Sequence, residues 1–266
     1  MIQKITTGIE GLDIILKGGI PENNIVMVTG GPGSGKSILC NQFLMDGINR
    51  RENGLYVSFE EEPDMIRRNF SAFNWNIDKL EKERKYKLLC MIAEYHPNAF
   101  PSFSKYIIKS ENKEKTPFHI DKPFNTEYVS EIISETAKEI NAKRIVLDSL
   151  TSLELYIGKE FEIRQQLLAL FRLLRRLHKD KNKITSLITS EIATGDKLSK
   201  FSADEFLVDG IIKLYNVREN DRRVRAIEII KMRGTDFMQG LYSMEITNEG
   251  IKVYPHEKIK IGREYG

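Results

Sequence analysis

Residues 30–37 combine four glycines with a lysine and a terminal serine in the spacing G-x-x-x-x-G-K-[ST]. Glycines let successive backbone N–H groups converge on phosphate oxygens, and a helix N-terminus adds partial positive charge. In this spacing Lys36 reaches the terminal phosphates, and the Ser37 hydroxyl ligates Mg²⁺. The motif predicts a nucleoside triphosphate site with bound Mg²⁺. We assign to it Gly31, Gly33, Ser34, Gly35, Lys36, Ser37 and Ile38.

The sequence on both sides of the motif supports this interpretation. Residues 25–29 form an apolar run typical of a buried strand, and residues 37–44 have the character of a helix. A strand–loop–helix context separates a phosphate-binding loop from a glycine-rich turn that binds nothing. We therefore favour the phosphate-binding loop over the turn.

Acidic side chains follow two further predicted strands. Asp148 ends the apolar run 144–148, where a carboxylate can hold Mg²⁺ through water, and Glu60 and Glu61 follow the run 55–59. The carboxyl ends of neighbouring parallel strands open onto one crevice, so these groups are expected beside the loop. One glutamate can then polarise the attacking water while the other orients it. The alternatives are a plain strand end at Asp148 and an acidic first helical turn at Glu60 and Glu61.

A cationic pair, Lys231 and Arg233, stands near the C-terminus after a predicted strand. Alternation places both side chains on one side of that strand. We predict that they act on a γ-phosphate, which can belong to a neighbouring subunit. The alternative is a solvated strand face.

The remaining pattern predicts an α/β fold, with apolar runs that alternate with helix-like segments around a mostly parallel sheet. The clearest helix spans residues 161–178, and the tail from residue 210 predicts antiparallel hairpins that extend the sheet. Residues 96–125 hold four prolines and show no sustained period, which indicates a surface insertion. We expect residues 1–266 to form a single domain.

Composition restricts the class of protein. The net charge of +3 is too small to indicate a polyanionic partner by itself. The two cysteines, Cys40 and Cys90, fit buried thiols in a reducing compartment. No apolar run is long enough for a membrane span, and the first residues do not begin a signal peptide. We expect a cytoplasmic protein without a membrane partner.

Several motifs in the same order resemble the KaiC-type domain of the RecA superfamily, over nearly the whole chain. They lie at residues 7–13 with 18–21, 30–37, 58–63, 73–75, 147–152, 231–235 and 246–251. The resemblance implies a RecA-like P-loop NTPase core that hydrolyses ATP at the interfaces of a homo-hexameric ring. It also implies a regulatory switch that signals to a protein partner, here unidentified. With one such domain, the chain is most similar to the single-domain archaeal KaiC-like ATPases.

The resemblance also carries roles for individual residues. It implies that Glu60 and Glu61 are the catalytic pair, and that Lys231 and Arg233 reach the γ-phosphate of the next subunit. It further implies that Thr235, Thr247 and Asn248 line the base and sugar side of the nucleotide.

Two departures from the family pattern stand out. The KaiC-type family includes a clock protein with two such domains, one of which phosphorylates itself. That domain carries a Ser-Thr pair where this chain has Glu205 and Phe206. We therefore expect hydrolysis without self-phosphorylation. Residues 96–125 have no clear counterpart, so their role is open.

Two other functions share this core. A DNA-binding recombination ATPase of the RecA/RadA type would use the basic stripe Arg172, Arg175, Arg176 and Lys179 and the loop 197–200. No aromatic residues alternate with these cations as a nucleic-acid stacking site requires, so nucleic acid is not the favoured partner. The third candidate is a nucleotide-gated scaffold with little turnover, against which the intact Glu60–Glu61 pair argues.

Overall fold

The computed structural model describes residues 2–95, 106–110, 118–123, 126–152, 160–179, 183–192, 204–219 and 221–259. Its strands are β1 (Lys4–Ile5), β2 (Ile20–Pro21), β3 (Ile25–Gly30), β4 (Asn53–Ser58), β5 (Tyr86–Tyr95), β6 (Tyr106–Ser110), β7 (Phe118–Pro123), β8 (Ala142–Asp148), β9 (Thr185–Glu191), β10 (Gly210–Glu219), β11 (Arg222–Met232), β12 (Leu241–Thr247) and β13 (Gly250–Lys258). Its helices are α1 (Glu10–Ile15), α2 (Lys36–Asn49), α3 (Pro63–Ser71), α4 (Ile77–Lys82), α5 (Thr126–Glu139), α7 (Glu160–Lys179) and α8 (Asp204–Leu207).

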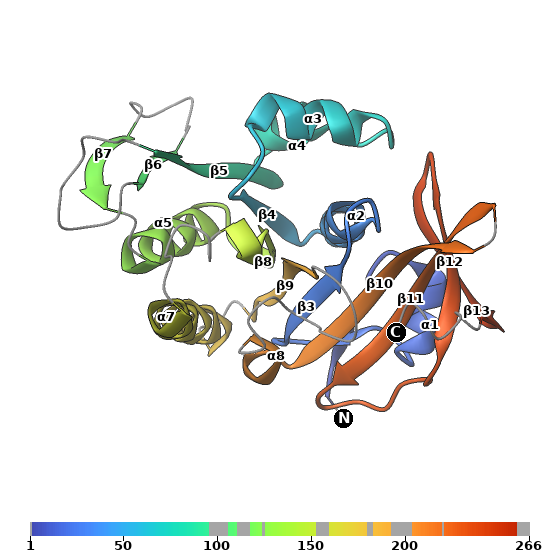
Figure 1. Ribbon diagram of the computed structural model, residues 1–266. Coiled ribbons are helices and arrows are strands. Elements are labelled where there is room, and N and C mark those ends of the chain that lie inside the picture. The colour runs from blue at the N-terminus through green and yellow to red at the C-terminus, as the bar shows by residue number, and fades with distance from the viewer. Residues whose placement is uncertain are drawn as a thin grey trace.

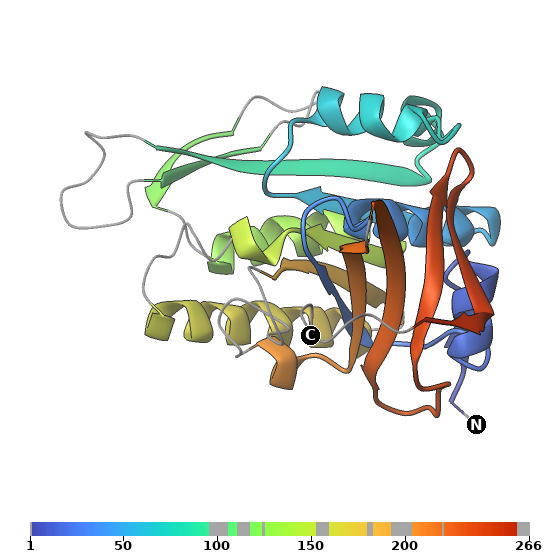
Figure 2. The ribbon, with the colours of Figure 1, turned by 45° about the vertical axis from the view of Figure 1, so that its right-hand side comes forward.

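One sheet organises the described residues, in the strand order β13-β12-β11-β10-β3-β9-β8-β4-β5-β6-β7 (Figure 1). The central strands from β10 to β5 run parallel to one another. Strands β11, β12 and β13 continue the sheet antiparallel at one edge, and β6 and β7 do so at the other (Figure 2). Because the parallel strands share a direction, the ends of β3, β4, β8 and β9 lie at one edge of the sheet.

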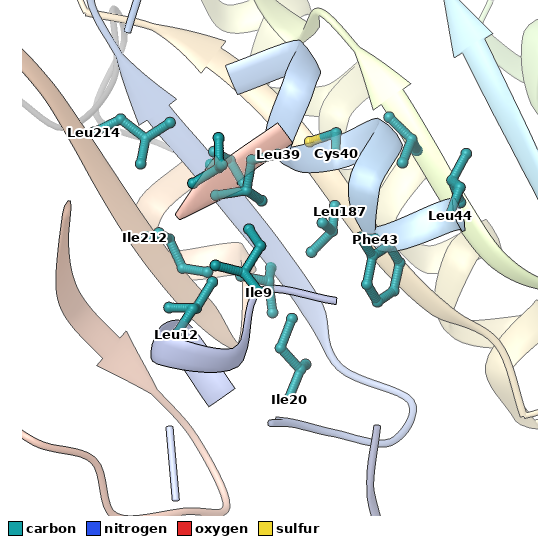
Figure 3. Close-up of a cluster of buried hydrophobic side chains, with 14 of the residues drawn as sticks. Ile9, Leu12, Ile20, Leu39, Cys40, Phe43, Leu44, Leu187, Ile212 and Leu214 are labelled. Atoms are coloured by element: carbon teal, nitrogen blue, oxygen red, sulfur yellow. The ribbon is translucent and has the colours of Figure 1, made fainter. Parts of the chain in front are cut away.

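The central strands are apolar on both faces, and alternation divides their side chains between two buried clusters. In β3, Val26 and Val28 pack toward α1 and α2, whereas Ile25 and Met27 pack toward α5 and α7. Figure 1 shows α2 on one face of the sheet and α5 and α7 on the other. Figure 3 shows the first cluster, in which Leu39, Cys40, Phe43 and Leu44 of α2 gather with Leu187, Ile212 and Leu214 from β9 and β10. The helix after the phosphate loop is thus fixed onto the sheet by apolar burial.

The amphipathic pattern predicted for residues 161–178 is confirmed by α7. The five apolar side chains of the predicted face recur at helical spacing, and each is buried against the second face of the sheet. They are Leu167, Leu170, Phe171, Leu174 and Leu177.

The predicted fold class is confirmed, namely a mostly parallel α/β sheet with C-terminal antiparallel strands. Two strands that the sequence pattern did not identify, β6 and β7, lie within residues 96–125 and lengthen the sheet beyond β5. Strands of five and six residues are too short for alternation to identify them. None of the helices in the described ranges is long and apolar enough to span a membrane.

Candidate functional site

The phosphate loop connects the end of β3 to the start of α2, as its motif predicts. Gly35 lies just before α2 with a φ of 103°, in the left-handed region that glycine adopts without strain. A Cβ atom at Gly35 would lie 3.1 Å from Cδ1 of Ile246, at the end of β12. Both the backbone angle and the close neighbour therefore require glycine at this position.

A cavity of about 680 Å³ opens over the loop, within the size range of small-molecule sites. It joins the loop to the ends of β4 and β8, where the sequence placed the carboxylates, and to the end of β9. Among the predicted site residues, it is lined by Gly33, Gly35, Lys36, Ser37, Ile38, Glu60, Glu61 and Asp148. The two remaining loop residues do not line the cavity. Ser34 is buried, and its Oγ has no hydrogen-bond partner among the described residues. A Cβ at Gly31 would meet nothing within 4 Å in the same part of the chain.

Lys36 is held over the loop that it belongs to. Its Nζ donates to the carbonyl oxygens of Gly30 at 2.8 Å and Gly31 at 3.3 Å, and lies 3.9 Å from Oε1 of Glu191. Glu191 ends β9, pairs with Gly30 in the sheet and lines the cavity. Sequence reasoning missed Glu191, although the rule that active groups follow parallel strands could have identified it.

Asp148 is oriented by two hydroxyl groups. Tyr56 of β4 and Thr189 of β9 each donate a hydrogen bond to its carboxylate. Burial, followed by the negative charge of Asp148, raises the pKa of Tyr56 well above its ordinary value, so the phenol remains a donor. The carboxylate is thereby fixed in the cavity from both neighbouring strands.

The oxygen donors in the cavity fit a magnesium ion. The hydroxyl of Ser37 and the carboxylate of Asp148 are hard ligands, and Mg²⁺ uses one or two protein oxygens together with substrate phosphates and water. The described residues contain no group of three His, Cys, Asp or Glu side chains that would hold a metal alone. The donor set therefore fits Mg²⁺ that arrives with a nucleotide.

Glu60 and Glu61 lie in different environments despite being adjacent. Glu60 accepts hydrogen bonds from the hydroxyls of Ser149 and Ser152, which follow β8, so its carboxylate is fixed. Glu61 accepts one hydrogen bond, 3.1 Å long, from Asn69 of α3. Partial burial, followed by the negative charge of Asp148, raises the pKa of Glu61, a change that suits a proton acceptor.

Arg225 of β11 is a cavity residue that sequence reasoning did not identify. Its Nε donates to the carbonyl oxygen of Gly33 at 3.4 Å, and Nδ2 of Asn216 in β10 donates to the same oxygen at 3.3 Å. The hairpin of β10 and β11 thus contacts the loop. No local pattern indicates this, because the contact depends on the pairing of β10 with β3.

Lys231 and Arg233 lie at the opposite end of the sheet from the loop of their own chain. Lys231 pairs with Ile211 of β10, which in turn pairs with Met27 of β3, upstream of the loop. At 3.3 Å per residue, the end of β11 is about 13 Å from Gly30 along the strand direction. Nζ of Lys231 donates to the carbonyl oxygens of Glu205 and Val208, and burial lowers its pKa. The structure therefore does not bring this pair to the cavity of its own chain.

The three residues predicted to line the base and sugar side are also separated. Thr235 follows β11, at the end of the sheet that holds Lys231 and Arg233. Thr247 is the last residue of β12, beside the cavity residue Ile246, and its Oγ1 donates to the carbonyl oxygen of Gly250. Asn248 begins the turn that leads to β13. None of the three lines the cavity.

The basic stripe proposed for DNA binding is partly engaged within the chain. Arg175 of α7 donates to both carboxylate oxygens of Asp209, at 3.2 and 3.1 Å. Residues 197–200, the other predicted phosphate contact, lie outside the described residues.

The chain is similar to known proteins in sequence and in fold. The sequence model of the family described as "ATPase: KaiC" matches residues 5–258. The chain is 37% identical to a UPF0273 protein of Pyrococcus furiosus, covering all of this chain and 99% of that protein. It is 36% identical to a UPF0273 protein of Thermotoga maritima, covering 97% and 98% respectively. The crystal structure of a KaiC-like protein from Pyrococcus horikoshii matches with a TM-score of 0.78 and 31% identity, over 96% of this chain and all of that one.

Proposed function

Because the chain belongs to the KaiC-like ATPase family, we propose that it is an Mg²⁺-dependent ATPase that works as a homo-oligomeric ring. ATP turnover at the interfaces of a hexamer would drive a conformational switch that a regulatory protein partner reads. The observation that carries the proposal is one cavity that joins a phosphate loop to four carboxylates, those of Glu60, Glu61, Asp148 and Glu191.

In this proposal, the phosphate loop and the charged and hydroxyl side chains predicted from the sequence have separate tasks. The loop N–H groups and Lys36 bind the phosphates, whereas Ser37 and Asp148 hold the Mg²⁺ that neutralises them. Glu60, fixed by Ser149 and Ser152, orients the attacking water. Glu61, whose pKa is raised, accepts the proton from that water.

The other half of the site comes from the next subunit. Lys231 and Arg233 lie far from the loop of their own chain, and the Arg233 side chain is 55% exposed. Cations supplied in trans stabilise the charge that develops on a transferred phosphoryl group. Two chains stacked in a ring would also bring Thr235 of one chain toward Thr247 and Asn248 of the other.

A double substitution tests the chemistry. Glu60→Gln/Glu61→Gln should lower kcat by at least about 100-fold, as expected when a general base is lost, and should leave the Kd for MgATP within about threefold. Glu62→Gln is the matched control, because Glu62 is adjacent and exposed but does not line the cavity. Parent-like turnover in the double variant would refute the assignment. Adding DNA to the same assay tests the recombination alternative.

The oligomeric part has its own experiment. Native mass measured with and without MgATP should give six copies of the chain in the presence of nucleotide. A stable monomer at high ATP concentration would leave Lys231 and Arg233 without a target. Incubation with labelled ATP should leave residues 204–209 unlabelled, because neither Glu205 nor Phe206 has a hydroxyl to phosphorylate.

A further inference from the structure

Asp209, just before β10, is a buried carboxylate for which the mechanism above has no task. Its side chain is only 12% exposed. Oδ2 accepts a hydrogen bond from the backbone N–H of Ile25 at 3.1 Å, and Arg175 donates to both oxygens. The carboxylate is thus fixed from β3 and α7 at once.

Arg233 meets this fixed carboxylate at two points. Its backbone N–H donates to the carbonyl oxygen of Asp209 at 2.8 Å, and Nη1 lies 3.6 Å from Oδ1. The side chain remains 55% exposed, and a guanidinium has five N–H donors in a planar fork. One edge of that fork can therefore face Asp209 while the other donors remain available to an anion.

The charge around Asp209 favours an external anion. Arg175, Lys231 and Arg233 gather around it, and the positive charge of Arg233 contributes to the lowered pKa of Lys231. One carboxylate, with Glu205 nearby, leaves a surplus of positive charge at this end of the sheet. Such a surplus attracts phosphate groups.

We propose that Asp209 is a positioning residue for Arg233, and that Arg175 fixes Asp209 in this task. The proposal rests on the proposed function, in which Arg233 contacts the γ-phosphate bound by a neighbouring subunit. A long, flexible arginine that must act across an interface loses less freedom when one edge of its fork is already oriented. Lys231 is held in place by the carbonyl oxygens of Glu205 and Val208, so its position should not depend on the Asp209 side chain, although the charge of Asp209 favours its protonated form.

Asp209→Asn is the first test, because the amide oxygen can still accept the N–H of Ile25 while the charge is lost. We expect kcat to fall about 10- to 100-fold, the range for a misplaced catalytic group. The Kd for MgATP and the native mass should not change, because the phosphate loop lies at the other end of the sheet. Arg175→Gln should act in the same direction, and its partly exposed side chain makes it the safer variant for folding.

A double-mutant cycle separates positioning from a general structural role. If Asp209 acts through Arg233, the Asp209→Asn loss should disappear in an Arg233→Ala background, and so should the Arg175→Gln loss. Additive losses, or a rate increase in Asp209→Asn, would overturn the positioning role. If Arg233→Ala alone leaves kcat unchanged, the proposed function is wrong in assigning Arg233 to the γ-phosphate of the neighbouring subunit. If Arg233→Ala lowers kcat but neither Asp209→Asn nor Arg175→Gln does, only the present inference fails.

Discussion

Arg144 on β8 donates a hydrogen bond from Nη1 to the carbonyl oxygen of Phe43 in α2, 2.7 Å away, and its guanidinium lies 4.6 Å from the centre of the Phe43 ring. This contact joins the strand that ends at Asp148 to the helix that follows the phosphate loop. The same fully buried guanidinium binds Asp46 at 3.0 Å and Glu52 at 2.7 Å. One buried side chain therefore joins β8, which carries Asp148, to α2, which carries Ser37.

Arg144→Met should destabilise the fold by about 3–5 kcal/mol, because it leaves Asp46, Glu52 and the Phe43 carbonyl without their buried donor. Urea unfolding followed by circular dichroism measures the difference. Arg144→Lys keeps the charge but not the planar fork, so its free energy of unfolding should lie between those of the parent and Arg144→Met. Unchanged stability in Arg144→Met would contradict this role.

Gly35→Ala should lower the free energy of unfolding by about 1–2 kcal/mol, the cost of a Cβ in left-handed backbone. It should also weaken MgATP binding, because the loop must shift away from Ile246. Gly31→Ala is the control for the stability measurement in nucleotide-free protein, since its Cβ enters open space. Thermal unfolding of both variants gives the comparison, and equal losses would argue against the strain at Gly35.

Arg225→Ala should weaken MgATP binding about tenfold, because it removes a cation from the cavity and a donor to Gly33. Arg222→Ala removes the same charge from the same strand, at an exposed position that does not line the cavity. The Kd of this variant for MgATP should therefore equal that of the parent protein. Titration with a fluorescent ATP analogue measures both. A similar loss in both variants would mean that only net charge matters.

The raised pKa of Asp13 predicts that the free energy of unfolding depends on pH. Burial raises its pKa from 3.8 to about 6 in the folded protein, so the folded state holds this proton more tightly than the unfolded state. The cost of ionising Asp13 is absent below about pH 4 and complete above about pH 6, so stability falls as pH rises through this window.

Asp13→Asn isolates that effect, because the amide oxygen still accepts the hydrogen bonds from Thr7 but does not titrate. Between about pH 4.5 and about pH 7, the parent should lose about 2 kcal/mol relative to the variant. Urea midpoints at the two pH values provide the measurement. A difference that does not change with pH would show that Asp13 ionises normally.

Local sequence was enough for the parts of this protein that depend on local chemistry. The phosphate loop needs glycines, a lysine and a hydroxyl within eight residues, and the face of α7 follows from spacing along one helix. The convergence of Glu60, Glu61 and Asp148 followed from a general property of parallel strands. The family likewise followed from motifs that keep their order along the chain.

The tertiary structure decided what depends on strand register and long-range packing. Pairing of β10 with β3 places Arg225 on the loop and Lys231 and Arg233 at the other end of the sheet. The same register separates Thr235 from Thr247 and Asn248. Arg144 and Asp209 are buried, so each charged group bonds to several parts of the chain and not to solvent. Register and burial join residues as distant in the chain as Gly33 and Arg225, which are 192 positions apart, and no local period encodes such distances.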